Sequence, residues 1–334
     1  MREIFKILVG LSALLTASPT SANAATLIPV TAVPGSVETD VLGINDNNVI
    51  AGRYFTADGV EHGFFGPLNG TYTTFDFMTG GTLARAINNS GYITGVFNNE
   101  GTHCSWGEFE RSPSGTIATV DRRRMPLNGV VQGINASGQF VGEYCQPDGT
   151  IKGYYGKDGK FESFLKLPFS TSWTAPRGIS KSGVVVGGYF ATNGTSMGFL
   201  LQNGVATTVN YPDPSELSTF LEGVNDNGLA SGTWQDTNGT YWAFVLDINS
   251  DTFTTIGVPN STFAQAFQVN RYGLVALYSD VGSFIYCPKA KSRCPNGGQE
   301  AIEIATKPIH VSPDSVRRVV CKIGCTPKES FDDR

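Results

Sequence analysis

Two glutamates and three arginines are the residues of this sequence best suited to act on a polar ligand. Glu143 and Glu222 could serve as the acid and base of glycoside hydrolysis, a reaction that uses a pair of carboxylates. Arg53, Arg85 and Arg177 could hold the carboxylate or the hydroxyl groups of such a substrate. These side chains can act together only if the fold brings them to one place.

A repeat organises the chain and positions these residues. Six variants of Gly-Ile-Asn occur, and their third residues are separated by 43, 47, 45, 45 and 45 positions: Asn45, Asn88, Asn135, Ser180, Asn225 and Asn270. The copy at 220–259 shows four short apolar strands separated by turn residues, with no helix signal. Four strands every ~40–45 residues is the spacing of a propeller blade.

We therefore predict an all-β fold, a six-bladed β-propeller of four-stranded antiparallel blades. A solenoid would also explain a repeat, but solenoid units are often shorter, ~20–30 residues, and need distinct caps. The N-terminal segment 27–34 resembles the last strand of a blade, so we expect it to pair beside 283–286 and close the ring. Segment 301–305 is also strand-like, so the last blade could take its outer strand from either terminus or from both.

The ends of the chain lie outside the repeats. Residues 1–24 have a basic start, an apolar run and small residues at the end, as a secretory signal peptide does. We expect the propeller to span 25–310, a cysteine-containing tail to span 311–334, and the protein to be secreted or periplasmic. The formal net charge is −5, and −6 without the leader, which argues against a nucleic-acid partner. We expect no membrane span and a monomer.

The six cysteines of an exported chain are expected to form disulfides. Cys104 and Cys145 each depart from the repeat and fall on one face of adjacent blades, so we predict that they pair. Cys287 and Cys294 would close a short loop. For the tail, the simplest pairing is Cys321 with Cys325, and cross-pairing with Cys287 or Cys294 stays open.

The repeat resembles that of the HAF-repeat family of bacterial extracellular proteins over residues 43–286. The first copy carries the resemblance most clearly, in Gly43-Ile-Asn45, Ala51-Gly52-Arg-Tyr54 and Glu61-His62-Gly-Phe-Phe65. Later copies replace the family's His by Lys152, Met197 and Trp242. The resemblance implies secretion and a propeller-like fold, and no shared reaction.

One face of the predicted disc should carry any binding site. The loops between second and third strands and between successive blades would share this face with the start of each innermost strand. Its polar and aromatic side chains suit a sugar, with aromatic faces for stacking and Arg for a carboxylate or hydroxyls. The predicted ligand-binding residues are Arg53, Arg85, Gln132, Arg177, Glu222, His62, His103, Lys152, Trp173 and Trp242.

Simpler structural roles compete with these. Arg85, Arg177 and Glu222 could simply pair with one another, and His62 and His103 occupy a repeat position that suits structural hydrogen bonds. Glu143 and Glu222 belong to blades three and five and could lie too far apart to cooperate. We expect Glu108 and Glu110 to be solvated charges at a strand edge.

The sequence thus leaves two functions open. The first is a binding module for a carbohydrate or an extracellular protein partner. The alternative is a hydrolase or lyase acting on an acidic polysaccharide at the propeller mouth. We predict no metal and no cofactor, because no sequence motif for either is present.

Overall fold

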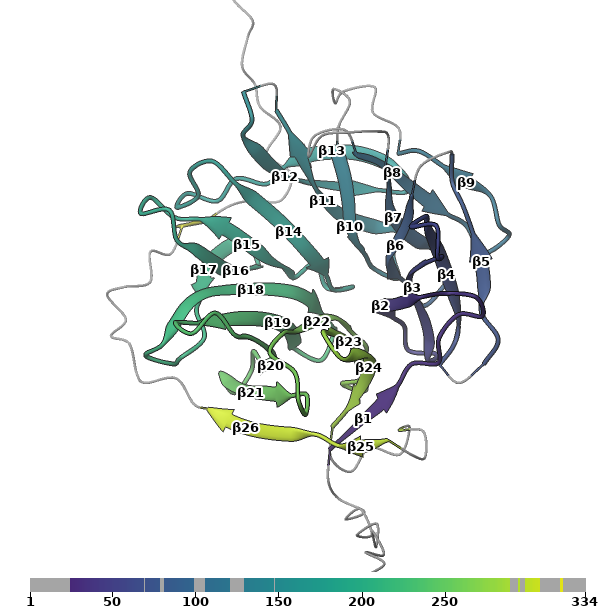
Figure 1. Ribbon diagram of the computed structural model, residues 1–334. Helices are drawn as coiled ribbons and strands as arrows, with labels where there is room; N and C mark the ends of the chain where they lie inside the picture. Colours follow the sequence, from purple (N-terminus) through teal and green to yellow (C-terminus); the bar gives the residue numbers. More distant parts are fainter. Residues whose placement is uncertain are drawn as a thin grey trace, which may run out of the picture.

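The computed structural model describes residues 25–68, 70–78, 81–98, 106–120, 129–146, 148–288, 294, 298–306 and 319–320. Within these residues the protein consists of strands and contains no helix. The strands form six antiparallel sheets that stand as blades around a common axis (Figure 1). The predicted six-bladed β-propeller is confirmed.

Each blade is a four-stranded sheet in chain order. Blade one contains β2 (Glu38–Ile44), β3 (Val49–Phe55), β4 (Glu61–Pro67) and β5 (Thr73–Phe75); blade two contains β6 (Thr82–Ile87), β7 (Ile93–Asn98), β8 (Trp106–Arg111) and β9 (Ile117–Ala118). Blade three contains β10 (Gly129–Ile134), β11 (Gln139–Cys145), β12 (Ile151–Lys157) and β13 (Lys160–Phe164); blade four contains β14 (Thr174–Ile179), β15 (Val185–Phe190), β16 (Ser196–Gln202) and β17 (Val205–Val209). Blade five contains β18 (Glu216–Val224), β19 (Leu229–Asp236), β20 (Tyr241–Asp247) and β21 (Thr252–Gly257); blade six contains β22 (Ala264–Val269), β23 (Val275–Ser279), β24 (Gly282–Cys287) and β1 (Thr26–Pro29).

The N-terminal strand closes the ring, as predicted. β1 pairs antiparallel with β24, with Ile28 opposite Ile285, and becomes the fourth strand of blade six. Because this place is taken, the C-terminal segment uses other outer edges. β25 (Gln299–Glu300) adds to β1, β26 (Ile302–Thr306) pairs with β21 of blade five (Figure 1), and β27 (Val319–Val320) pairs with β17 of blade four. Both ends of the chain thus contribute to the last blade, β1 as its fourth strand and β25 as a short fifth, whereas segment 301–305 pairs with blade five instead.

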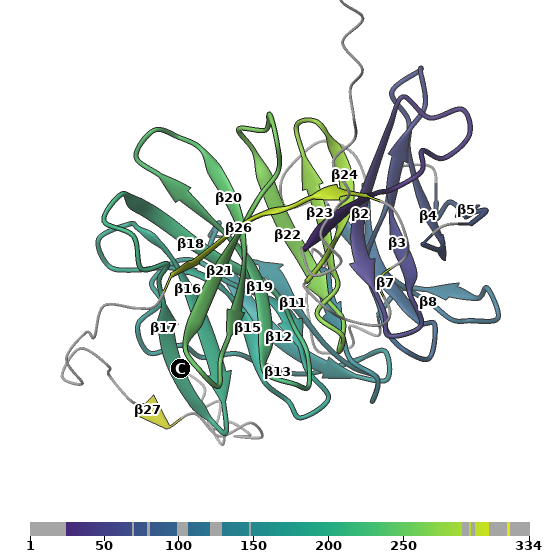
Figure 2. The ribbon, with the colours of Figure 1, turned by 90° about the horizontal axis from the view of Figure 1, so that it is seen from below.

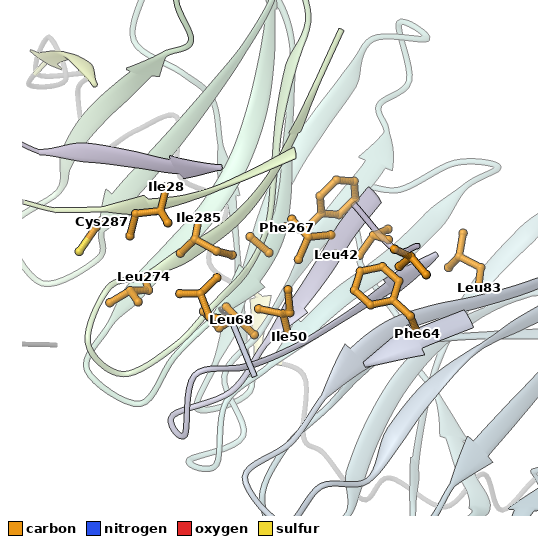
Figure 3. Packing of buried hydrophobic residues seen from close by; sticks show 14 of the residues in the cluster. Ile28, Leu42, Ile50, Phe64, Leu68, Leu83, Phe267, Leu274, Ile285 and Cys287 are labelled. Carbon is orange, nitrogen blue, oxygen red and sulfur yellow. The ribbon is translucent and has the colours of Figure 1, made fainter. Parts of the chain in front are cut away.

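The hydrophobic core lies between neighbouring blades, whose sheets stand beside one another in Figure 2. At the closing seam, Leu274 and Ile285 of blade six belong to one buried cluster with Leu42, Ile50 and Phe64 of blade one (Figure 3). A single blade has two apolar faces and cannot bury both alone, so each blade is stabilised by its neighbours.

The repeated Asn joins each blade to the next. Asn45 Oδ1 accepts hydrogen bonds from the backbone N–H groups of Asn47 (2.9 Å) and Val49 (3.0 Å), which fixes the turn between β2 and β3. Asn45 Nδ2 donates to the carbonyl oxygen of Asn88 in the next blade (3.0 Å). The same inter-blade bond leaves Asn88, Asn135, Asn225 and Asn270, and the last of these ends on the Asn45 carbonyl.

The predicted cysteine pairs are tested in part. Cys287 and Cys294 form a disulfide with a Cα–Cα distance of 5.9 Å, as predicted. Cys145 is also disulfide-bonded. Its predicted partner Cys104, and Cys321 and Cys325, lie outside the described residues, as do the predicted leader 1–24 and nearly all of the predicted tail 311–334. Among the described residues, no helix has the length and apolar character needed to cross a membrane.

The seam between blades four and five lacks the amide bond, because its donor position is Ser180. The Ser180 hydroxyl accepts from Val184 N–H (3.1 Å) and contacts Ser182 Oγ (2.9 Å), but no bond runs from it to the Asn225 carbonyl within the described chain. We expect Ser180→Asn to complete the ring and raise stability by about 1 kcal/mol.

Thermal unfolding of the mature protein measures this effect. A gain of that size should raise the midpoint by about 2 °C in a domain of this length. The mirror variant, Asn225→Ser, removes an existing bond and should lower it. A Ser180→Asn midpoint equal to or below the parent's would contradict the role given to the Asn ring.

Candidate functional site

The innermost strand of every blade has a β-bulge just before its Gly-Ile-Asn position. A bulge leaves one residue without a cross-strand partner and re-aims its side chain. The bulged residues line a channel on the propeller axis: Leu42, Arg85, Gln132, Arg177, Glu222 and, in blade six, Phe267 with Gln268. Four of the predicted ligand-binding residues, Arg85, Gln132, Arg177 and Glu222, therefore meet around one channel.

Close approach of the inner strands explains the glycines that follow the bulges. A Cβ atom on Gly178 would lie 2.9 Å from Gly223 Cα, and one on Gly133 would lie 2.3 Å from the Arg177 carbonyl oxygen. Only glycine allows backbones to come so near. The channel is consequently narrow at the level of these glycines.

Gln268 occupies the equivalent place in blade six and spans the axis. Its Oε1 accepts from the backbone N–H groups of Ile44 (3.1 Å) and Ile87 (3.2 Å), and its Nε2 donates to the Ile87 carbonyl (2.9 Å). Blade six is thereby tied to blades one and two. Sequence reasoning missed this residue, although its signal was present, because the other copies have Gly or Ala at this position.

A cluster of charged and amide side chains lies around the channel beside Gln268. We call Arg85, Gln132, Glu143, Arg177 and Glu222 the channel cluster. Arg177 Nη1 lies 3.3 Å from Glu143 Oε1, and its Nε lies 4.0 Å from Glu222 Oε2. Arg85 Nη2 lies 3.7 Å from the same Glu222 oxygen, and Gln132 Nε2 donates to Glu143 Oε1 (2.6 Å).

This geometry decides two expectations. Arg85, Arg177 and Glu222 do pair with one another, as the structural interpretation proposed. The expectation that Glu143 and Glu222 lie far apart is wrong, because both carboxylates flank the guanidinium of Arg177. Glu143 comes from the second strand of its blade and does not line the cavity itself, but it contacts Arg177 and Gln132, which do.

Burial dominates the electrostatics of the cluster. It raises the pKa of the Glu222 carboxyl, and the nearby Arg177 and Arg85 offset this only in part. Burial, together with the like charge of Arg177, lowers the pKa of Arg85 to about 10. The charges of the two arginines and two glutamates cancel, so the channel is polar without a net charge.

The open space in the channel is small. The cavity bounded by the bulged residues has a volume of about 30 Å³, which corresponds to roughly two water molecules. A sugar ring cannot enter it. A saccharide ligand would have to lie at the mouth and extend no more than a small group inward.

The other predicted residues that the structure describes do not line the channel cavity. Arg53 Nε donates to Asp40 (2.8 Å), and its Nη1 donates to Glu61 (3.0 Å), so its guanidinium is held within blade one. Burial raises the pKa of Asp40.

His62 and Trp242 have structural partners. His62 Nδ1 lies 2.8 Å from Asp76 Oδ1, and its ring stacks on Tyr54 at 5.0 Å. Trp242 Nε1 donates to Asp236 (3.1 Å). Lys152 is exposed on β12, and His103 lies outside the described residues.

Bridges between blades confirm which ends of the strands share a face. Ile151 at the start of β12 bridges Trp173, just before β14, and Tyr241 at the start of β20 bridges Phe263, just before β22. The start of each third strand therefore lies beside the start of the next innermost strand. We call this side of the disc the loop face.

An aromatic wall on the loop face adjoins the channel cluster. The Trp173 ring lies 4.7 Å from that of Phe190 and 5.3 Å from that of Phe220, and the Arg177 guanidinium lies over Phe220 at 5.2 Å. Trp173 was predicted, but Phe190 and Phe220 were not. Phe220 could have been found because it lies on the same innermost strand as Glu222, two positions before it.

Glu108 does not have the predicted exposure. It is fully buried and accepts a hydrogen bond from Tyr154 Oη of the next blade (2.5 Å). It is thus a residue of the seam between blades two and three. The position of Glu108 in its own repeat did not reveal this burial, because the covering residue belongs to the neighbouring blade.

Comparison with known proteins adds little to this description. No protein-family profile and no curated protein matches the chain. AofleA from Arthrobotrys oligospora is a similar solved structure, with 12% identity and a TM-score of 0.43 over 86% of this chain and 94% of that one. Selenomethionine-substituted virginiamycin B lyase from Staphylococcus aureus has 11% identity and a TM-score of 0.28 over 79% and 88%. Similarities this low say nothing about function, so the site rests on its own geometry.

The raised pKa of Glu222 gives a stability prediction. The folded state holds the Glu222 proton more tightly than the unfolded chain does, so ionisation of Glu222 costs stability as the pH rises above its ordinary value of 4.5. Glu222→Gln cannot ionise. The variant's unfolding free energy, relative to that of the parent, should therefore increase from pH 4.5 to 7.5.

Urea unfolding across this pH range measures the difference. Glu162→Gln, the same substitution at an exposed position of β13, serves as the matched control. If the difference in unfolding free energy between Glu222→Gln and the parent stays constant or falls as the pH rises, the arginines, and not burial, dominate the pKa of Glu222.

Proposed function

We propose that this protein is an exported binding module that holds a saccharide on the loop face of its propeller. The observation that carries the proposal is the aromatic wall of Trp173, Phe190 and Phe220 beside Arg177. Aromatic faces stack on the C–H groups of a sugar ring, and the guanidinium offers several hydrogen-bond donors to its oxygens.

The distribution of exposed apolar side chains supports a binding role for this face. Most of the large exposed hydrophobic residues in the described chain lie in or beside its loops: Val37, Val60, Met78, Phe164, Phe190, Leu217 and Val281. The opposite face consists mainly of tight polar turns, and Tyr92 is its exposed aromatic residue. Apolar groups gathered on one face favour contact with a ligand or partner.

Export and membership of the HAF-repeat family are parts of the same proposal. The leader at residues 1–24 and the disulfide between Cys287 and Cys294 support an oxidising compartment, outside the cell or in the periplasm. The Gly-Ile-Asn repeat supports the family.

An enzyme acting on an acidic polysaccharide is the second candidate. Its supporting observation is that Glu143 and Glu222 flank one arginine, and that burial raises the pKa of Glu222 as a general acid requires. The small cavity counts against it, because a glycosidic bond would have to reach carboxylates that Arg177 already occupies. We therefore favour binding.

Truncation of Trp173 tests the saccharide site. We expect Trp173→Ala to weaken binding on a glycan array by roughly tenfold or more, because stacked aromatic residues dominate such contacts. Tyr92→Ala is the matched control, since Tyr92 is an exposed aromatic residue on the opposite face. Equal loss in both variants, or none in Trp173→Ala, would place binding elsewhere, and an array without any bound glycan would leave a protein partner as the better account.

Incubation with polyuronides tests the enzymatic candidate. The binding proposal predicts no release of reducing ends by the mature protein. Release that disappears in Glu222→Gln would instead establish the enzyme, whereas release that persists in this variant would exclude the mechanism based on Glu222.

A further inference from the structure

The channel cluster contains a hydrogen-bond acceptor and a donor that no described residue satisfies. Gln132 Oε1 and Arg177 Nε are both buried and have no partner within hydrogen-bonding distance among the described residues. The orientation of the Gln132 amide is fixed, because its Nε2 donates to the Glu143 carboxylate at 2.6 Å. Gln132 lines the cavity, and its oxygen is therefore the amide atom that has no partner among the described residues.

Arg85 adds further donors at the same place. Its guanidinium makes no hydrogen bond to any described residue, and Glu222 Oε2 is 3.7 Å away, beyond hydrogen-bonding distance. The Arg85 side chain retains 19% of its exposure inside the channel. A group that enters the cavity thus meets one free acceptor and several free donors.

A hydroxyl group matches this set, and a carboxylate does not. A hydroxyl donates one hydrogen bond and accepts two, so it can serve Gln132 Oε1 and the arginines together. A carboxylate only accepts, so it would leave Gln132 Oε1 unsatisfied. It would also lie beside the existing carboxylates of Glu143 and Glu222, which already balance the two arginines.

The size of the cavity restricts the hydroxyl to one on a short arm. The volume of about 30 Å³ admits about two water molecules, or one hydroxymethyl group, but no pyranose ring. A primary hydroxyl projects from the ring of a hexose by one carbon. The ring itself can then remain at the mouth beside the aromatic wall.

We propose that the channel cluster is a subsite for the primary hydroxyl of a neutral hexose, with Gln132 and Arg177 as the residues that select it. This inference rests on the proposed saccharide binding and specifies its ligand class. It disfavours uronic acids, in which a carboxylate replaces the hydroxymethyl group.

Calorimetry with matched methyl glycosides tests the inference on the mature protein. The ligands are glucose, galactose and mannose, each compared with its 6-deoxy and 6-carboxylate counterparts. For the hexose that binds, we expect removal of the 6-hydroxyl to weaken affinity by roughly tenfold, because the polar groups of the channel lose their partner. The uronate should bind no better than the 6-deoxy sugar.

The variant Gln132→Leu assigns the effect to the channel. It removes the acceptor at similar volume, and it should reduce the difference between hexose and 6-deoxy sugar to within about twofold. Tyr92→Ala should retain the full difference. The comparison of ligands on the unaltered protein needs no variant, so the test survives if Gln132→Leu fails to fold.

The outcomes distinguish failure of this inference from failure of the proposed saccharide binding on which it rests. A hexose that binds no better than its 6-deoxy form, or a uronate that binds best, overturns the hydroxyl subsite and leaves saccharide binding standing. Binding that discriminates equally in Gln132→Leu also overturns it. Failure of every glycoside and of the glycan array overturns both.

Discussion

A repeated asparagine carboxamide, which makes hydrogen bonds both within its own blade and to the next blade, holds this propeller together. In five of the six repeats, an Asn closes its own turn through Oδ1 and holds the next blade through Nδ2. The two tasks fix each other, since a turn that shifts would withdraw the donor from its neighbour. Apolar burial between blades supplies most of the stabilisation, but it has no direction. The carboxamides add a directional contact at five of the six seams.

The narrow axis follows from this ring and in turn shapes the candidate site. Inner strands drawn so close require glycine at positions such as Gly133 and Gly178, and Gln268 ties blade six to blades one and two across the channel. Charged side chains placed at the bulges must then neutralise one another. The channel cavity is consequently a small polar chamber and not a cleft, so a sizeable ligand would have to lie outside it.

The repeat carried enough information to predict the architecture, but not all of the contacts. Strand order, blade number and closure by β1 followed from the spacing and from the apolar patterns, because these depend on local chemistry that recurs six times. Arg85, Gln132, Arg177 and Glu222 were predicted to meet because one position in a repeat occupies one place in the ring. Glu143, Gln268 and Glu108 were misjudged or missed. Their environment is set by the neighbouring blade, and the distance between inner strands does not appear in the sequence of any single repeat.

Closure by β1 has a consequence for the order in which this protein can fold. The Ile28–Ile285 pairing joins the two ends of the propeller, so the first strand of the propeller to be synthesised must wait for the last blade. Until then the pairing edge of β1, and the face of blade one that packs against blade six, remain without their partners. Contacts of such long range are slow to form, and their unpaired strands are prone to wrong associations. β26, which lies along the outer edge of blade five, is added only after the ring can close, because it follows blade six in the chain.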